Sequence, residues 1–107
     1  MKQFPGGLQN FLKQAQQMQN KMAKVEAELE TIVVDGTAGG GAVTAKMNCK
    51  PSLVSVTIKK DVVSGDDVEM LQDLVTIAIN EALKKAEETK STAMEKVTGG
   101  LSMPGLF

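Results

Sequence analysis

An unbroken heptad near the start of the chain is the feature that most constrains its fold. Apolar residues recur there at alternating spacings of three and four: Leu8, Phe11, Ala15, Met18, Met22, Val25, Leu29 and Ile32. Such a repeat is typical of a helix that packs along a partner helix. The segment is also rich in helix-forming Gln, Lys, Met, Ala and Glu, and it follows the breaker Pro5-Gly6-Gly7. The sequence therefore predicts a long helix from Leu8 to about Glu30, with an apolar seam along one side.

Three segments after this helix have the composition of strands. Thr31–Asp35 is short, β-branched and ended by Gly36. Val43–Cys49 and Val54–Ile58 alternate apolar with polar residues, which indicates half-buried strands. The stretch Gly39-Gly40-Gly41 lacks the Lys-Ser/Thr of a phosphate-binding loop and is interpreted as a hairpin loop. Together these segments predict a three-stranded antiparallel meander with one apolar face for a helical layer to cover.

A second long helix is predicted from Asp67 to about Thr98, where Gly99-Gly100 stops it. Asp66 stands at the N-cap position and Glu69 three residues later, as in a capping box, so the adjacent carboxylates are interpreted as a cap and not as a metal site. The apolar face of this helix is broad in its first half, as expected of a helix that lies on a sheet. It is narrow in the second half, which is therefore expected to pack against the apolar seam of the first helix. The predicted fold class is α+β, with the order α-β-β-β-α.

The composition argues against an enzyme. The chain has no histidine, arginine, tyrosine or tryptophan, and one cysteine, Cys49. It therefore lacks a Ser-His or Cys-His pair and an imidazole or thiolate metal site. We expect no catalytic residue, no metal, no cofactor and no small-molecule substrate. Cys49, on the apolar side of its strand, is expected to be a small core residue.

Location and assembly follow from length and hydropathy. The first residues lack the apolar run of a signal peptide, a lone cysteine cannot form an intrachain disulfide, and no stretch approaches the roughly 18 apolar residues of a membrane span. A cytosolic protein without membrane contact is therefore expected. Because a chain of 107 residues has a small core, a homodimer is expected as well.

Charge is distributed unevenly along the chain. The net charge is −1, from 12 lysines and 13 acids. It divides into 4 − 3 = +1 over residues 1–30, 4 − 1 = +3 over residues 31–60 and 4 − 9 = −5 over residues 61–107. Within the first helix every lysine precedes every acid. This asymmetry permits a polyanionic partner for the first half of the chain.

Several short motifs, taken together, resemble a known family. They include Phe4-Pro5-Gly6-Gly7, the run Lys13–Gln19, the Gly39-Gly40-Gly41 loop, Asn80–Lys85 and Gly99-Gly100-Leu101. In this order and spacing the chain resembles the YbaB/EbfC-type nucleoid-associated proteins of bacteria. The resemblance implies the α-β-β-β-α fold, a homodimer whose helical arms project like tweezers, a place in the nucleoid, and binding of DNA with little sequence preference.

The residues limit how DNA could be bound. Reading of bases relies on arginine, and binding of single strands relies on aromatic stacking, but this chain has no arginine and three phenylalanines. Lysines with Gln and Asn suit the phosphate backbone of double-stranded DNA. The candidate residues are Lys2, Lys13, Lys21, Lys24, Lys84 and Lys85. For the last two, ion pairs with neighbouring glutamates are the competing interpretation.

A second function class stays open beside DNA binding. The Gln-rich helix could engage another protein, which would make the chain a scaffold or protein-interaction module. In either case residues 1–107 are expected to form one domain. Residues 99–107 are expected to be a flexible tail, with a docking peptide as the alternative.

Overall fold

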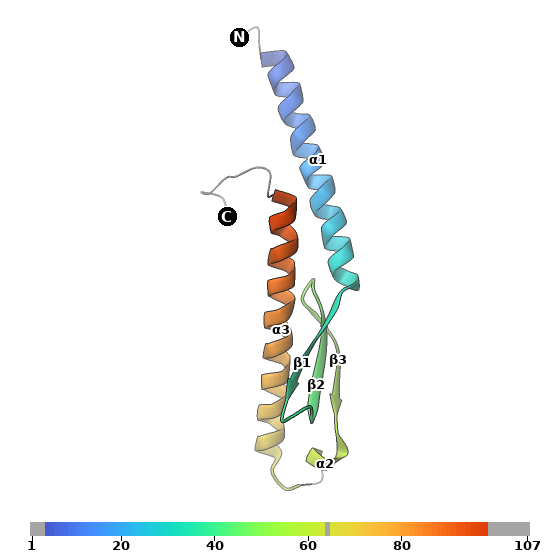
Figure 1. The fold of residues 1–107 in the computed structure, drawn as a ribbon, viewed down its shortest axis with the longest axis vertical. Helices are drawn as coiled ribbons and strands as arrows, with labels where there is room; N and C mark the ends of the chain where they lie inside the picture. Colours follow the sequence, from blue (N-terminus) through green and yellow to red (C-terminus); the bar gives the residue numbers. More distant parts are fainter. Residues whose placement is uncertain (1–3, 64, 99–107) are drawn as a thin grey trace.

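A long sheet-and-helix body carries a projecting helix in the computed structural model, which describes residues 4–63 and 65–98 (Figure 1). The elements are α1 (Phe4–Thr31), β1 (Val33–Ala38), β2 (Val43–Asn48), β3 (Ser52–Ile58), α2 (Lys60–Val63) and α3 (Val68–Thr98). The molecule measures 77 × 24 × 16 Å, because both long helices run along its long axis. The predicted α-β-β-β-α order with two long helices is confirmed, and the short α2 is an addition to it.

The sheet is the antiparallel meander predicted from the alternating strands, with β2 in the centre. Val43, Ala45 and Met47 of β2 are buried, and α3 packs over this face of β1 and β2. Polar residues of β2 lie on the opposite face. The alternation of β2 therefore predicted correctly which side chains face the helix.

A stripe of small residues lets α3 approach the sheet closely. Ala78, Ala82 and Ala86, spaced four residues apart along one side of α3, are all fully buried. Gly36 of β1 lies beneath them, and a Cβ atom placed on it would collide with the backbone of Ala78 and Ala82. The prediction that the first strand ends at Asp35 is therefore wrong. Gly36 continues the strand because its missing side chain makes room for the helix.

Two helix starts also differ from the prediction. Helix α1 begins at Phe4 and not at Leu8, because Pro5 falls in the first turn, where its lack of an N–H costs no hydrogen bond. Helix α3 begins at Val68, and the backbone N–H of Met70 donates to Oδ1 of Asp67 at 2.9 Å. Asp67, and not Asp66, is therefore the N-cap.

The seam of α1 is only partly covered within one chain. Leu29 is buried and Val25 half-buried where α1 meets the core and α3. Towards the N-terminal end of α1, Leu8 and Phe11 are 55% and 65% exposed. The predicted pairing of the seam with the second half of α3 is therefore correct for the last two turns of α1. It is wrong for the first turns, because α1 projects beyond the end of α3 (Figure 1).

Cys49 is completely buried at the end of β2, as expected of a core residue. We predict that Cys49→Ala lowers the free energy of unfolding by about 1 kcal/mol, because a small packed group is removed from a small core. Urea unfolding followed by circular dichroism measures this. Because the thiol does not reach the surface, the change should leave any DNA binding, measured as retardation of a duplex in a gel, intact. Loss of retardation with the fold intact would show that our interpretation of Cys49 is wrong.

Candidate nucleic-acid interface

The projecting half of α1 presents amides and cations to solvent. Its side chains from Gly7 to Gln17 are all exposed, and no acid precedes Glu26 in the described part of the helix. The polar positions are Gln9, Asn10, Lys13, Gln14, Gln16, Gln17, Gln19 and Asn20. This arm therefore offers hydrogen-bond donors and positive charge along about 20 Å of helix.

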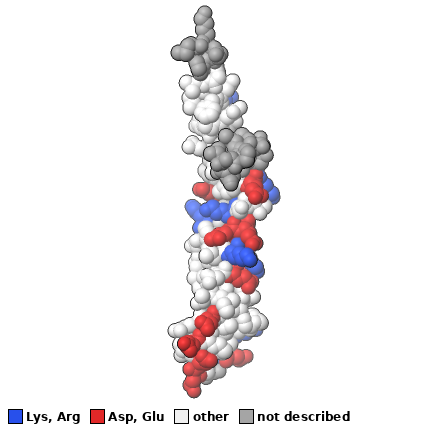
Figure 2. Space-filling view, turned by 90° about the vertical axis from the view of Figure 1, so that its left-hand side faces the viewer, with Lys and Arg blue, Asp and Glu red and all other residues white. Residues whose placement is uncertain are grey.

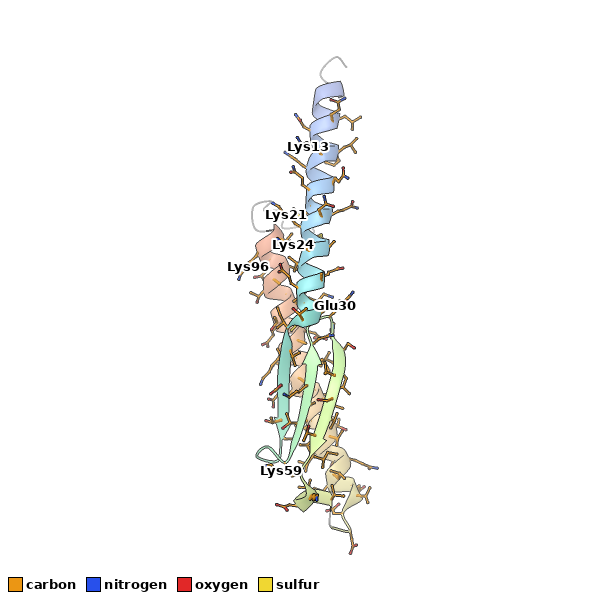
Figure 3. The ribbon with its side chains drawn as sticks, turned by 90° about the vertical axis from the view of Figure 1, so that its right-hand side faces the viewer. Lys13, Lys21, Lys24, Glu30, Lys59 and Lys96 are labelled. Atoms are coloured by element: carbon orange, nitrogen blue, oxygen red, sulfur yellow. The ribbon has the colours of Figure 1, made fainter. Side chains whose placement is uncertain are left out.

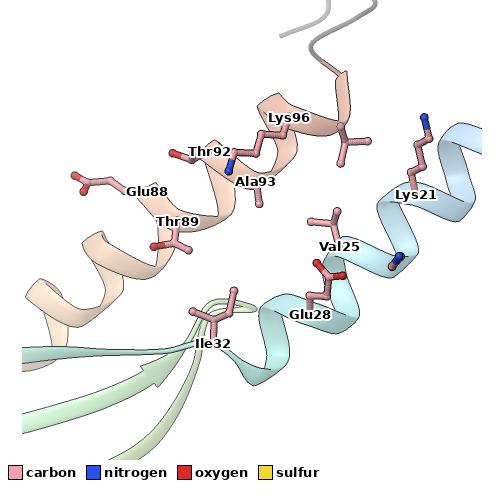
Figure 4. Close-up of a pocket in the computed structure, with 11 residues that line it drawn as sticks. Lys21, Val25, Glu28, Ile32, Glu88, Thr89, Thr92, Ala93 and Lys96 are labelled. Carbon is pink, nitrogen blue, oxygen red and sulfur yellow. The ribbon is translucent and has the colours of Figure 1, made fainter.

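An open groove of about 710 Å³ lies where α1 diverges from α3. Its apolar surface comes from Val25, Ile32, Ala93 and Val97. Figure 4 shows α1 and α3 on its two sides, with Lys21 and Glu28 on the first and Lys96 and Glu88 on the second. The groove thus joins an apolar floor to a charged rim.

Three lysines come together around this groove. Lys21 and Lys24 line it from α1, and Lys96 lines it from the last turn of α3. Figure 3 places the three near one another along the molecule, with Lys13 farther out on the arm. Lys13, Lys21 and Lys24 therefore lie on one continuous element, as the sequence predicted, and Lys96 extends the set across the groove.

Lys96 is the residue that the sequence did not single out. Among the lysines of α3, the sequence pointed to Lys84 and Lys85. The place of Lys96 at the C-terminal end of α3, next to Gly99-Gly100, was the available signal, because that end was expected to meet the seam of α1. The fold turns this position into one rim of the groove.

The two lysines of α3 that the sequence predicted, Lys84 and Lys85, lie away from the groove. The ammonium of Lys85 donates to the carbonyl oxygen of Asp35 at 2.8 Å and lies 3.2 Å from Oε1 of Glu81. The contact with Glu81 is the ion pair that the competing interpretation predicted, and the hydrogen bond to Asp35 ties α3 to β1. Lys84 is exposed beside it. Lys2 lies outside the described residues. A role of these lysines in DNA binding stays a prediction.

A set of contacts at the base of α1 holds the arm. The backbone N–H of Cys49 donates to the carbonyl oxygens of Leu29 at 3.0 Å and Ile32 at 3.1 Å. Beside it, Lys50 Nζ and Glu30 Oε1 are 2.7 Å apart. This hydrogen bond to the carboxylate raises the pKa of Lys50 above its ordinary value. The turn between β2 and β3 therefore fixes where α1 leaves the sheet.

Acidic side chains gather at the opposite end of the molecule. Figure 2 shows them around the base of the sheet-and-helix body, whereas cations lie among acids in the middle. The acids near α2 and the start of α3 are Asp61, Asp66, Asp67, Glu69 and Asp73. A polyanion would be repelled from this end and attracted towards the arm, because Coulomb forces act over about 10 Å at moderate salt.

Two further properties concern the described residues. No helix among them has the length and hydropathy to cross a membrane. No group of three or more His, Cys, Asp or Glu side chains in residues 4–63 and 65–98 is arranged to hold a metal ion.

The fold and the arm define a class: small α+β proteins in which a three-stranded sheet supports two long helices, one of them a projecting arm with cations. The pattern of the YbaB/EbfC DNA-binding family matches residues 4–101. The chain belongs to this family of DNA-binding, nucleoid-associated proteins, which are not enzymes. The family assignment made from short motifs is confirmed.

Relatives of similar length support the same conclusion. The chain is 52% identical to a nucleoid-associated protein of Clostridium novyi (97% of this chain, 96% of the relative). It is 53% identical to one of Thermoanaerobacter pseudethanolicus, with the same coverage. A crystal structure of an uncharacterized protein from Helicobacter pylori has the same fold, with a TM-score of 0.71 at 23% identity over 88% of this chain and 92% of that one.

Proposed function

We propose that the protein binds the phosphate backbone of double-stranded DNA through α1 and the groove rim, as a homodimer and with little preference for sequence. Such binding would organise the nucleoid and influence gene expression broadly. The observation that carries this proposal is the cluster of Lys21, Lys24 and Lys96, continued along the arm by Lys13.

The chemistry of the arm fits backbone contacts. Ammonium groups and amide side chains bond phosphate oxygens, and these contacts position a protein without reading bases. Two acids, Glu28 and Glu88, line the same groove. They partly offset the lysines there, so the surface is mildly positive and suits weak contacts repeated along a duplex. A second copy would double their number.

An uncovered apolar surface on β3, formed by Leu53, Val56 and Ile58 and called the shelf below, supports the homodimer. Leu53, Val56 and Ile58 pair with the buried residues of β2 and therefore share the sheet face that α3 covers. A helix about 10 Å wide covers about two strands spaced ~4.8 Å apart, so α3 leaves the third strand open. Leu53 is 46% exposed and Ile58 37%. A second copy packed on this shelf would remove it from water.

We predict that light scattering at micromolar concentration gives twice the 11.4 kDa chain mass. Leu53→Asp with Ile58→Asp should raise the dimer dissociation constant by about 100-fold or more, because two charges would enter an apolar contact. The matched control is Ser55→Asp with Thr57→Asp, on the polar face of the same strand. A monomeric wild type would contradict the dimer, and equal effects of both pairs would contradict the shelf.

A gel-shift titration tests the DNA proposal. Three duplexes of unrelated sequence and equal length should be retarded with similar affinity at low salt. Because binding releases counterions, the affinity should fall steeply between about 50 and 200 mM salt. A strong preference for one duplex would contradict backbone binding.

The alternative, a scaffold that binds another protein, is favoured by the exposed apolar side chains on the arm. Leu8, Phe11 and Leu12 are each more than half exposed. Absence of retardation for every duplex even at low salt would make this alternative the better function.

A further inference from the structure

The groove between α1 and α3 leaves apolar side chains uncovered within one chain. Val25, Ala93 and Val97 are half-buried on its walls, and Ile32 at its lower end is 40% exposed. Its volume of about 710 Å³ lies within the range of about 300–1,000 Å³ that is typical of ligand-binding clefts.

The part of the chain that follows α3 starts at the rim of this groove. Val97 lines the groove, and α3 ends one residue later at Thr98. Residues 99–107 have the sequence Gly-Gly-Leu-Ser-Met-Pro-Gly-Leu-Phe. They begin with two glycines, which permit a sharp reversal, and the rest of the segment has four large apolar residues and no charged side chain.

The lengths match. From Val97 down to Glu88 the groove extends along nine residues of α3, or about 13 Å. Seven residues in extended conformation span up to about 23 Å. A segment that reverses at Gly99-Gly100 can therefore pass the whole apolar surface down to Ile32.

Charge and tethering favour this segment over an unlinked partner. The rim carries Lys21, Lys24 and Lys96 against Glu28 and Glu88. An uncharged peptide leaves all five charges in water, whereas a charged helix from another protein would meet some of them unfavourably. A segment tethered at the rim also has an effective concentration of about millimolar or more.

We propose that residues Leu101–Phe107 fold back and occupy the groove between α1 and α3 of the same chain. They would cover Val25, Ile32, Ala93 and Val97 and brace α1 against α3. This docking does not depend on DNA binding. It assigns to residues 99–107, outside the described structure, the role of a docking peptide in place of the flexible tail predicted from the sequence.

Disulfide trapping in a Cys49→Ala background tests the proposal in the full chain. Thr92→Cys lies on the groove and Ser91→Cys does not, although both positions are exposed and adjacent on α3. Each is combined with Met103→Cys. A docked segment should form the intrachain disulfide with position 92 about tenfold faster than with position 91. Non-reducing electrophoresis and mass spectrometry follow the reaction, and circular dichroism checks the fold.

A second pair tests whether the segment reaches α1. Leu106→Cys should react with Glu28→Cys, on the groove, about tenfold faster than with Ala27→Cys, exposed and off the groove. Equal rates at the groove and control positions would overturn the proposal. Disulfides that form mainly between chains would overturn the assignment to the same chain. Either result leaves the gel-shift test of DNA binding unaffected.

Discussion

Replacing Lys13, Lys21 and Lys24 together with Gln should weaken binding to every duplex by about 100-fold or more and flatten its salt dependence. These lysines follow α1 from the arm to the groove and are exposed. Each phosphate contact contributes roughly −0.9 to the slope of log affinity against log salt, so six lost contacts in a dimer would reduce the slope by about 5. Gel shifts at several salt concentrations measure both quantities, and circular dichroism should show the helices unchanged.

The matched control removes the same charge from another place. Lys46, Lys59 and Lys60 are exposed on β2 and around the start of α2, away from the groove. Their joint replacement by Gln should change the affinity far less than the triple change in α1. If both variants lose affinity equally, net charge and not a defined surface governs binding. If the α1 variant binds as before, the DNA surface lies on α3 or the sheet.

Gly36→Ala should destabilise the fold by about 3 kcal/mol or more and lower the melting temperature by about 15 °C. The added Cβ would enter the backbone of α3 at Ala78 and Ala82, which cannot move without separating α3 from β1. The loss is large because the buried core here consists mainly of alanines, so a small displacement uncovers much of it. Thermal unfolding followed by circular dichroism measures the effect.

Gly7→Ala is the control for the change of glycine to alanine itself. Gly7 lies in α1, and a Cβ on it would meet nothing within 4 Å. Alanine there should leave stability unchanged or raise it by about 0.5–1 kcal/mol, because it favours the helix. A melting temperature for Gly36→Ala close to that of wild type would mean that α3 does not pack on β1 as described.

The sequence was sufficient for those parts of the fold that depend on local periodicity. The heptad placed Val25 and Leu29 on the side of α1 that meets α3, and the alternation of β2 identified Val43 and Ala45 as buried. Both patterns arise because one side of a helix or strand faces the core. They are therefore readable without knowing what the element packs against.

The parts that could not be predicted depend on contacts between distant segments. From the sequence, Gly36 is read as the end of a strand, and its role becomes clear only from the close packing of α3 on it. The sequence offers both Asp66 and Asp67 as caps, and the hydrogen bond from the N–H of Met70 identifies Asp67. The candidate site shows the same division. Lys21 and Lys24 were assigned to one helix correctly, but Lys96 joins them only through the packing of α3 against α1.

The hydrogen bonds of Cys49 form a joint at the base of α1, so a small tilt there moves the far end of the helix by a larger distance. The backbone N–H of Cys49 holds the carbonyl groups of Leu29 and Ile32 at one end of the helix, and about 25 residues separate Leu29 from Phe4. At 1.5 Å per residue this stretch of α1 is about 38 Å long, so a tilt of about 10° at the joint displaces its tip by about 6.6 Å. That displacement is close to the ~6 Å width of the minor groove of DNA. In the proposed dimer, the distance between the tips of the two arms would therefore be set by a few hydrogen bonds at the base of each arm.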